Sequence, residues 1–276
     1  MPGVSGKGPP QVTLPRRGPG RPAASGVPAT TLRVACYNVR SLRDDVDALV
    51  RVITAMRPDV LCLQEVPRLL WWRRAVLARR VGMTVAAGRR GGPLAVLAGP
   101  GVRTVHAEYH LLRPFPPLQR RALAIAVVAK DGRRAAVGSV HLDLSAGARL
   151  WHAAEIAEHM ARVRDRFGVP DVLAGDLNEG PGRPAWRYLT RRYTDCFAAA
   201  PEGDGATFPA ARPRHRIDGV FAGPGLAVRA CGVPRATPAD LAAATDHLPV
   251  LADLVFHHDL GDECRTGDTH LRTICS

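Results

Sequence analysis

The sequence lacks the features that mark secreted and membrane-spanning proteins. No apolar run in its 276 residues approaches the roughly 18 residues that a transmembrane helix needs. No early segment combines a basic start, a continuous apolar stretch and a cleavage site, so we predict no signal peptide. We therefore expect a cytoplasmic protein without a membrane span.

The six cysteines do not form the pattern of a disulfide-stabilised domain. Cys36 and Cys62 fall inside apolar runs, where cysteine is usually a small buried residue. Cys264 and Cys275 lie in a segment without hydrophobic periodicity. These positions favour a reduced, intracellular protein.

Both ends of the chain lack the material for a hydrophobic core. Residues 1–30 are rich in Pro, Gly, Ser and Arg and hold almost no large apolar residue, so we expect a disordered basic leader. Residues 257–276 also lose periodicity and are expected to be a disordered tail. Residues 31–256 are then one large domain, because the motifs described below are spread across them.

The charge balance is strongly basic, with a formal net charge of +13 and a pI of about 10.6. Such a charge favours a polyanionic partner, either nucleic acid or an anionic membrane surface. Nearly all of the positive charge is arginine and the chain is rich in alanine. A bias in genome composition therefore remains an alternative explanation.

Apolar periodicity predicts strands that alternate with helices. Two helices are expected, over residues 44–56, which Pro58 ends, and over residues 146–167. The β-like runs are residues 32–39, 60–63, 94–97, 122–129, 135–140, 171–174, 217–221 and 250–255. Such alternation predicts layered α/β packing.

Polar residues lie at or near the ends of several of these apolar runs. They are Asn38, Glu65, His141, the pair Asp176 and Asn178, Asp218, and the pair Asp246 and His247. Each has a structural explanation, since turns after strands favour Asp and Asn, and a lone histidine in a strand can be a core residue. Together they are the groups that a metal-dependent phosphodiesterase needs.

In order and residue type these clusters resemble the endonuclease/exonuclease/phosphatase superfamily, which includes deoxyribonuclease I, exonuclease III, neutral sphingomyelinases and inositol-polyphosphate phosphatases. The resemblance runs from about Leu32 to about Val255. It implies a four-layer α/β sandwich, with two mixed β-sheets packed face to face and helices outside. The site is expected where the loops of both sheets meet.

The resemblance assigns a metal site to the first two clusters. Gln64-Glu65 matches the main metal-ligand motif, and Asn38 would help to hold the metal or a phosphate oxygen. A hard cation such as Mg²⁺ or Mn²⁺ takes one or two carboxylates together with waters and phosphate oxygens. Arg40 stands where many relatives carry Asp, which favours a one-metal site.

The later motifs supply proton transfer and phosphate contacts. By resemblance, Asp176 orients or deprotonates the attacking water and Asn178 contacts the phosphate. Asp218 would hydrogen-bond the imidazole of His247, fix its tautomer and raise its pKa. Residues 245–250 complete the family's Ser/Thr-Asp-His-x-Pro-Val pattern. Asp246 would then bind the metal or orient a histidine.

His141 places the chain in the branch that uses two histidines, as deoxyribonuclease I and the sphingomyelinases do. Deoxyribonuclease I pairs this histidine with a Glu, but residues 89–93 offer no acid. Contact with the phosphate is therefore better supported for His141 than proton donation. Arg121 is a further candidate phosphate contact. Trp71 to Arg74 are expected to lie on a helix that packs its indoles on the sheet, and stacking on a substrate is the alternative.

These residues predict a divalent-metal-dependent phosphoesterase that hydrolyses phosphodiester bonds without a covalent intermediate. The substrate favoured by charge is DNA or RNA, cut with little sequence preference by a monomer. A phospholipid or a small phosphorylated metabolite is the alternative substrate. A catalytically silent binding module on the same fold is the alternative from another class.

Overall fold

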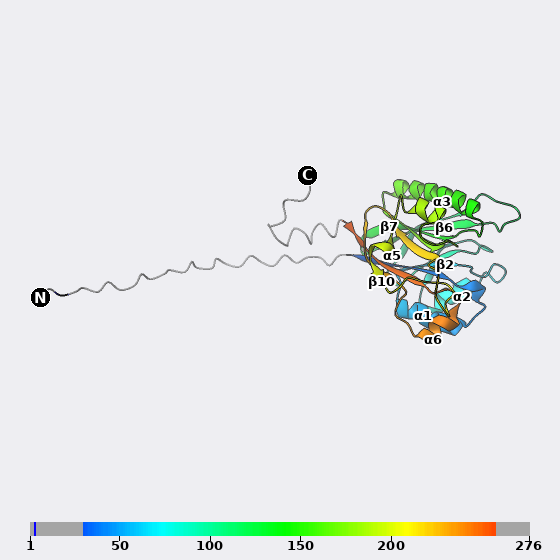
Figure 1. Cartoon of the computed structure of the whole chain (residues 1–276), viewed down its shortest axis with the longest axis horizontal. Helices are drawn as coiled ribbons and strands as arrows, with labels where there is room; N and C mark the ends of the chain where they lie inside the picture. Colours follow the sequence, from blue (N-terminus) through cyan, green and yellow to red (C-terminus); the bar gives the residue numbers. More distant parts are fainter. Residues whose placement is uncertain (1–2, 4–29, 258–276) are drawn as a thin grey trace.

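Two β-sheets pack face to face and are covered on their outer sides by helices (Figure 1). In this computed structural model the described residues are residue 3 and residues 30–257. The layers run from α1 and α6 at one side, through the two sheets, to α3 at the other. The predicted four-layer α/β sandwich is confirmed. The predicted leader and tail lie almost wholly outside the described residues.

The first sheet holds seven strands in the order β10-β12-β13-β1-β2-β4-β3. Its strands are β1 (Thr31–Asn38), β2 (Val60–Gln64), β3 (Thr84–Gly88), β4 (Ala95–Ala98), β10 (Pro201–Glu202), β12 (Leu226–Gly232) and β13 (Val250–Phe256). The central pair β1 and β2 is parallel, and β13 lies antiparallel to β1.

The second sheet holds six strands in the order β5-β6-β7-β8-β11-β9. They are β5 (Arg103–Leu111), β6 (Ala122–Lys130), β7 (Arg133–His141), β8 (Asp171–Asp176), β9 (Thr194–Asp195) and β11 (Asp218–Ala222). Here too the central pair, β7 and β8, is parallel, and β11 lies antiparallel to β8. In both sheets, therefore, the carboxyl ends of two neighbouring strands meet at one edge.

Helix α1 (Val46–Met56) covers the outer face of the first sheet. Asp45 caps its first turn, because its carboxylate accepts hydrogen bonds from two backbone N–H groups. The left-handed conformation of Arg57 ends the helix just before Pro58. Its apolar stripe, which includes Leu49 and Ile53, is fully buried. The predicted helix is thus confirmed, apart from its first two residues.

Helix α3 (Ala146–Phe167) covers the second sheet and has the bounds that periodicity predicts. Its face with Ile156, Met160 and Val163 is buried against the sheet, and Gly168 ends it with a left-handed φ. The remaining helices are η1 (Arg40–Leu42), α2 (Arg73–Arg80), α4 (Pro184–Leu189), α5 (Cys196–Ala199) and α6 (Pro238–Ala244). Of these five, the sequence predicted only a helix at residues 71–74, and α2 begins at Arg73.

A core of small side chains separates the two sheets. Its members are chiefly Val, Ala, Leu and Cys from alternate positions of the strands. Within it, the amide of Gln64 donates to Ser139 Oγ at 3.0 Å, and that hydroxyl donates to the Leu63 carbonyl at 3.1 Å. These buried bonds join the ends of β2 and β7, so the two sheets are held together close to where their polar residues emerge.

Two further sequence predictions bear on this core and on membrane association. The four cysteines in the described part of the chain, Cys36, Cys62, Cys196 and Cys231, are buried and free. No helix in residues 30–257 combines the length and the apolar character that a membrane span requires.

Candidate active site

Strand register brings the polar strand ends of both sheets to one edge of the sandwich. Asn38 lies opposite Gln64 in the parallel pair of the first sheet. His141 lies opposite Asp176 in the parallel pair of the second sheet, and Asp218 faces Asp176 from the antiparallel neighbour. Residues separated by more than a hundred positions in sequence therefore converge.

The carboxylate of Asp176 is the centre of this cluster. Its Oδ2 accepts a hydrogen bond from Asn38 Nδ2 at 3.0 Å and lies 3.4 Å from His141 Nε2 and 3.8 Å from His247 Nε2. Its Oδ1 accepts from the backbone N–H of Asn178 at 2.9 Å. Burial and the neighbouring Asp218 raise the pKa of Asp176.

Asn38 links Asp176 to Glu65. The same Nδ2 group that donates to Asp176 also donates to Glu65 Oε1 at 3.1 Å. Asn38 is buried, whereas Glu65 is half-buried, and its Oε2 has no hydrogen-bond partner among residues 30–257. One amide thus holds two carboxylates from different sheets at a fixed spacing.

The backbone near the site adopts conformations that are uncommon for residues other than glycine. Glu65 has a φ of 52° and Asn178 a φ of 50°, and Arg40, Ser41 and Leu42 also have positive φ. Left-handed conformations are disfavoured for L-residues and tend to occur where function requires a fixed geometry. Here they turn the chain sharply at the ends of β2 and β8.

His247 forms a buried hydrogen bond with the carboxylate of Asp218, whose other oxygen has no hydrogen-bond partner among the described residues. Its Nδ1 donates to Asp218 Oδ2 at 2.9 Å, and the ring packs against Phe208 with centroids 4.9 Å apart. Burial disfavours the charged ring, but the hydrogen bond and charge of Asp218 outweigh it and raise the pKa of His247 to about 9. His247 is therefore protonated at neutral pH.

His141 has the opposite electrostatic surroundings. Burial lowers the pKa of His141 to about 4, and the nearby Arg121 and His247 act in the same direction against the attraction of Asp176. Its Nε2 lies 3.0 Å from Asn178 Nδ2, which can only donate, so Nε2 accepts. His141 is therefore a neutral imidazole at neutral pH, with its proton on Nδ1.

Asp246 and Arg40 form an ion pair beside this cluster. Arg40 Nε lies 3.3 Å from Asp246 Oδ2, and Arg40 also contacts Asp44 at 3.3 Å. The other oxygen of Asp246 accepts from the Thr245 hydroxyl. Arg40 is thus paired with one oxygen of a predicted metal ligand.

A second set of buried polar residues supports the site, and Arg121 is the only one of them that the sequence predicted as a site residue. Arg121 contacts Asp143 at 3.4 Å. Arg149 donates to Glu179 at 2.6 Å and to the carbonyls of Asp143 and Leu144. Asp143 lies two residues after His141, and Glu179 directly follows Asn178. This proximity to predicted site residues was the signal available in the sequence.

The donor set fits a hard divalent cation. Carboxylate oxygens of Asp176 and Asp218 lie within 4.8 Å of each other, and Asp218 Oδ1 is buried without a hydrogen-bond partner in the described part of the chain. The ring of His247 lies in the same group, but it is protonated at neutral pH and therefore does not bind a cation. Glu65 joins this group through Asn38 and has a free oxygen of its own. A buried carboxylate oxygen left unpaired is costly unless a cation or water satisfies it. Oxygen donors of this kind suit Mg²⁺ or Mn²⁺.

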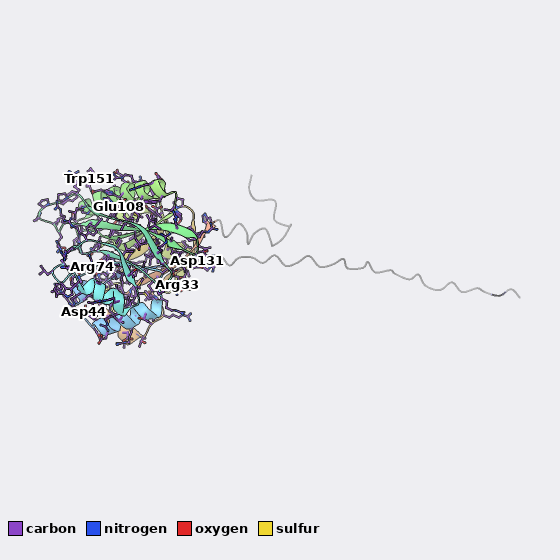
Figure 2. All side chains as sticks on the ribbon, turned by 180° about the vertical axis from the view of Figure 1, so that it is seen from behind. Arg33, Asp44, Arg74, Glu108, Asp131 and Trp151 are labelled. Atoms are coloured by element: carbon purple, nitrogen blue, oxygen red, sulfur yellow. The ribbon has the colours of Figure 1, made fainter. Side chains whose placement is uncertain are left out.

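The predicted packing of the two tryptophans on the sheet is wrong. Trp72 is 49% exposed, and Trp71 lies beneath the guanidinium of Arg90, 4.1 Å from its ring centroid. Both residues lie in the connection between Glu65 and helix α2. The short apolar run there, Leu69-Leu70, is followed by Trp71, Trp72, Arg73 and Arg74, so the segment has no continuous buried face. Figure 2 places Arg74 from α2 and Trp151 from α3 at the end of the molecule opposite Arg33 and Asp131.

Several solved structures of other proteins have a fold similar to that of this chain. An endonuclease/exonuclease/phosphatase from Bacteroides vulgatus has 22% sequence identity and a TM-score of 0.71, over 82% of this chain and 99% of that one. A mannosyl-6-phosphatase from Bacteroides thetaiotaomicron has 19% identity and a TM-score of 0.69, over 82% and 100%. The catalytic domain of human Nocturnin has 17% identity and a TM-score of 0.65, over 82% and 94%.

The similarity to these structures shows a shared fold. The family is assigned from the sequence. No curated protein matches the chain in sequence. The model of the endonuclease/exonuclease/phosphatase family, however, matches residues 35–247, which span the site from Asn38 to His247. The chain therefore belongs to the endonuclease/exonuclease/phosphatase family, whose members are phosphoester hydrolases.

Proposed function

We propose that this protein is a divalent-metal-dependent hydrolase of phosphodiester bonds. The observation that carries the proposal is the placement of Asp176, whose carboxylate lies between a charged and a neutral histidine and is tied by Asn38 to Glu65. This arrangement offers a proton acceptor, a proton donor and a metal-binding carboxylate within one cluster.

Each residue of the cluster has its own role in the in-line attack of water on the phosphorus atom. Asp176 is placed to orient the attacking water and accept its proton, since its pKa is raised above that of an ordinary carboxylate. The amide of Asn178 would be a neutral donor for a phosphate oxygen, in exchange for one of its present bonds to His141 Nε2 and to the Leu142 carbonyl. His247 is protonated and can donate to the leaving oxygen or to the phosphate, whereas neutral His141 contributes an orienting contact.

A metal would be held at Glu65 and Asn38, with Asp246 as a further candidate ligand. When bound, Mg²⁺ or Mn²⁺ supplies positive charge that stabilises the phosphate oxygens during hydrolysis. The Asn38 side chain positions Glu65 for this role, because it donates to Oε1 and leaves Oε2 free. Arg40 would have to yield its contact with Asp246 if that carboxylate also bound the ion.

Nucleic acid is the substrate class that charge favours. The net charge of +13 lowers the free energy of bringing a polyanion to the surface, and Arg40 and Arg121 lie beside the cluster. Contacts of arginine with phosphates carry no sequence information. We therefore propose a nuclease with little sequence preference, acting as a cytoplasmic monomer.

A phospholipid is the second candidate because apolar side chains are exposed on loops that begin at site residues. Leu69 is 91% exposed and follows Glu65 by four positions, and Leu144 is 77% exposed and follows His141 by three. Exposed leucines and tryptophans mixed with arginines are typical of surfaces that contact a lipid interface.

A salt series separates the two substrates. Cleavage of plasmid DNA and of phospholipid vesicles is measured at fixed metal concentration while the salt concentration rises. The nuclease proposal predicts nicking of DNA whose rate falls steeply with salt, because counterion release drives binding. Lipid hydrolysis without any nicking, under every metal tested, would refute the nuclease and leave the phosphodiesterase.

A further inference from the structure

A basic pocket lies next to the cluster and has no part in the chemistry described above. It has a volume of about 230 Å³ and is formed between the connection from β3 to β4 and the facing ends of β5 and β6. We call it the arginine pocket. Its lining residues are Arg68, Arg89, Arg90, Gly91, Gly92, Pro93, Tyr109, Leu111, Arg120 and Ala122.

The charge of this pocket is uncompensated. Four of its lining residues are arginines and none is acidic. Within residues 30–257, none of these four arginines forms an ion pair with an Asp or Glu, although other arginines of the chain do. Guanidinium groups that converge without a carboxylate attract an anion, and phosphate suits their planar, forked arrangement of donors.

A buried polar atom in the wall also lacks a partner. The hydroxyl of Tyr109 is shielded from solvent and makes no hydrogen bond with any described residue. It lies so close over Gly92 that a Cβ there would approach it to 2.5 Å, so glycine is required at that position. Burial raises the pKa of Tyr109, while the nearby charges of Arg68 and Arg89 oppose the rise. The hydroxyl therefore stays protonated at neutral pH, as a donor without a partner among the described residues.

The wall of the pocket is fastened in place. Arg74 donates to the carbonyl of Arg89 at 2.6 Å, and Arg68 donates to the carbonyl of Gly91 at 3.3 Å. The guanidinium of Arg90 is stacked on Trp71. These contacts set the guanidinium groups of Arg68 and Arg90 and the backbone at Arg89, so these groups lose less conformational entropy when a ligand arrives.

The pocket adjoins the catalytic cluster from both sheets. On one side, the backbone N–H of Val66, directly after Glu65, donates to the carbonyl of Pro93 at 2.9 Å. On the other side, Arg120 directly precedes Arg121, which contacts Asp143 near His141. The pocket is thus one residue from Glu65 in the first sheet and one residue from Arg121 in the second.

We propose that the arginine pocket binds a second phosphate group of the substrate, distinct from the phosphate that is hydrolysed. The role in substrate binding rests on the proposed phosphodiesterase activity. The binding of phosphate depends only on the residues of the pocket itself. Two sources could carry such a group, namely a neighbouring backbone phosphate of a nucleic acid and a terminal phosphomonoester.

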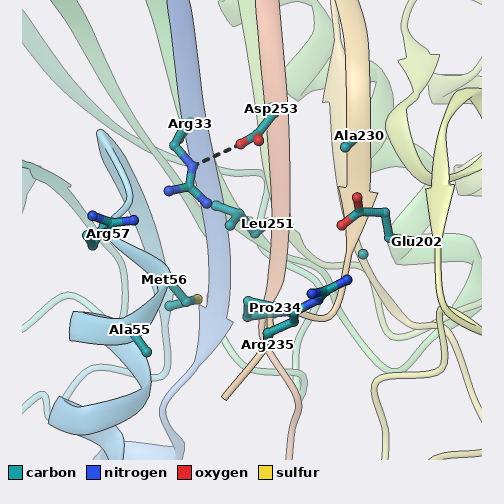
Figure 3. A pocket seen from close by; sticks show the side chains of 11 residues that line it. Arg33, Ala55, Met56, Arg57, Glu202, Ala230, Pro234, Arg235, Leu251 and Asp253 are labelled. Atoms are coloured by element: carbon teal, nitrogen blue, oxygen red, sulfur yellow. Dashed lines mark hydrogen bonds and ion pairs between the residues drawn. The ribbon is translucent and has the colours of Figure 1, made fainter.

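A second pocket of the molecule also contains arginines, but acidic residues line it as well. It lies on the outer face of the first sheet and is lined by Arg33, Arg57 and Arg235 together with Glu202 and Asp253 (Figure 3). There Arg33 Nε is bound to Asp253 Oδ1 at 3.0 Å. Unlike the arginine pocket, its wall holds two carboxylates, of which Asp253 is paired with Arg33. Removing the charges of Arg57 and Arg235 there is therefore a control for the loss of two positive charges.

The first test measures binding of inorganic phosphate to the full-length chain by calorimetry, without added metal. Arg89→Gln combined with Arg120→Gln should raise the Kd of phosphate roughly 10- to 100-fold, as expected for loss of hydrogen bonds to a charged group. The control, Arg57→Gln combined with Arg235→Gln, removes the same charge and should change the Kd less than about threefold. Equal Kd values for wild type and the Arg89/Arg120 variant, or an equal loss in the control, would overturn the proposal.

The second test identifies which phosphate the pocket takes. We compare kcat/KM for a dinucleotide, the same dinucleotide with a terminal 5′-phosphate, and a trinucleotide. The Arg89/Arg120 variant should lose about tenfold more activity on an extended substrate than on the plain dinucleotide. Loss confined to the terminal phosphate identifies a phosphomonoester, and loss on the trinucleotide identifies the backbone. Equal loss on all three would overturn the proposal.

The two tests separate this inference from the proposed function. If wild-type protein hydrolyses none of these diesters with any metal, the phosphodiesterase proposal fails. The calorimetry then still decides whether the pocket binds phosphate. Tyr109→Phe adds a variant that keeps the packing of the ring, and it should weaken phosphate binding by itself because only the unpartnered hydroxyl is removed.

Discussion

His141 and His247 approach the same oxygen of Asp176, at 3.4 and 3.8 Å, yet they carry opposite charge states. The pKa of His141 is lowered to about 4, while that of His247 is raised to about 9. The difference arises because Asp218 hydrogen-bonds His247, whereas His141 is buried beside Arg121 and Asn178. At neutral pH one histidine of the pair is a proton donor and the other is neutral.

These charge states predict two separate titrations in the metal-free protein. Nuclear magnetic resonance of the imidazole protons should give a midpoint near 4 for His141 and near 9 for His247. Replacing Asp218 with Asn should lower the His247 midpoint, because a neutral amide stabilises the charged ring less. Two midpoints close to the ordinary value of 6.5 would contradict the division of roles.

The raised pKa of His247 also predicts how stability depends on pH. A group whose pKa is higher in the folded state stabilises the fold fully below its unfolded pKa of 6.5, and this stabilisation is lost as pH rises through 9. A shift of this size corresponds to roughly 3 kcal/mol. The Tm difference between metal-free wild type and His247→Gln should therefore be largest near pH 6 and shrink towards pH 10. A constant difference would argue against the shift.

Loss of either histidine should lower the rate, but to different degrees. A positioned acid contributes roughly 10²- to 10⁴-fold, so His247→Ala should lower kcat within that range. His141→Ala should have the milder effect, because a neutral ring at this position orients the substrate and Asn178 without donating a proton. A larger loss for His141→Ala would reverse the assignment, and an unchanged rate would place the chain outside the two-histidine branch.

Arg40 should compete with the metal. It is paired with Asp246, and a cation near predicted metal ligands disfavours a second cation by electrostatic repulsion. Arg40→Gln should lower the Mg²⁺ concentration that gives half-maximal activity. Arg51→Gln is a suitable control, since Arg51 is paired with Asp240 on the helical side of the first sheet. An equal change in both variants would show only the effect of net charge.

The buried pair of Arg149 and Glu179 should be important for stability. Glu179→Ala leaves the guanidinium of Arg149 buried without a carboxylate, which typically costs about 3 to 5 kcal/mol of unfolding free energy. The exposed pair of Arg164 and Asp165 is the control, and Asp165→Ala should cost less than about 1 kcal/mol. Chemical denaturation measures both. Similar small losses would mean that the buried pair is not a determinant of stability.

The sequence predicted the residues at strand ends better than the elements around them. Asn38, His141 and Asp176 end long apolar strands, and they converge through the register within each sheet and the packing of the two sheets on each other. The edge strand β5 was missed because its residues alternate among Arg, Thr, His and Glu and are only partly buried. The short helices α4 and α6 contain too few residues to show a helical period.

The contacts between the site and the residues that support it could not be predicted from the sequence either. The contact of Arg149 with Glu179 joins residues thirty positions apart, and neither residue belongs to a motif. The ion pair between Arg40 and Asp246 depends on the loop conformations of both residues. Side-chain directions in the connection from β3 to β4, and hence the arginine pocket, follow from tertiary contacts with β5 and β6.

The central claim is that Glu65 binds a metal required for phosphodiester hydrolysis, and one measurement tests it most directly. Hydrolysis of a chromogenic phosphodiester is followed as Mg²⁺ or Mn²⁺ is added to chelator-treated wild type and Glu65→Gln, with Glu202→Gln as the control. We predict that activity appears with metal in wild type and the control, and that Glu65→Gln is nearly inactive with an unchanged Tm. Full activity in excess chelator, or wild-type activity in Glu65→Gln, would contradict the account.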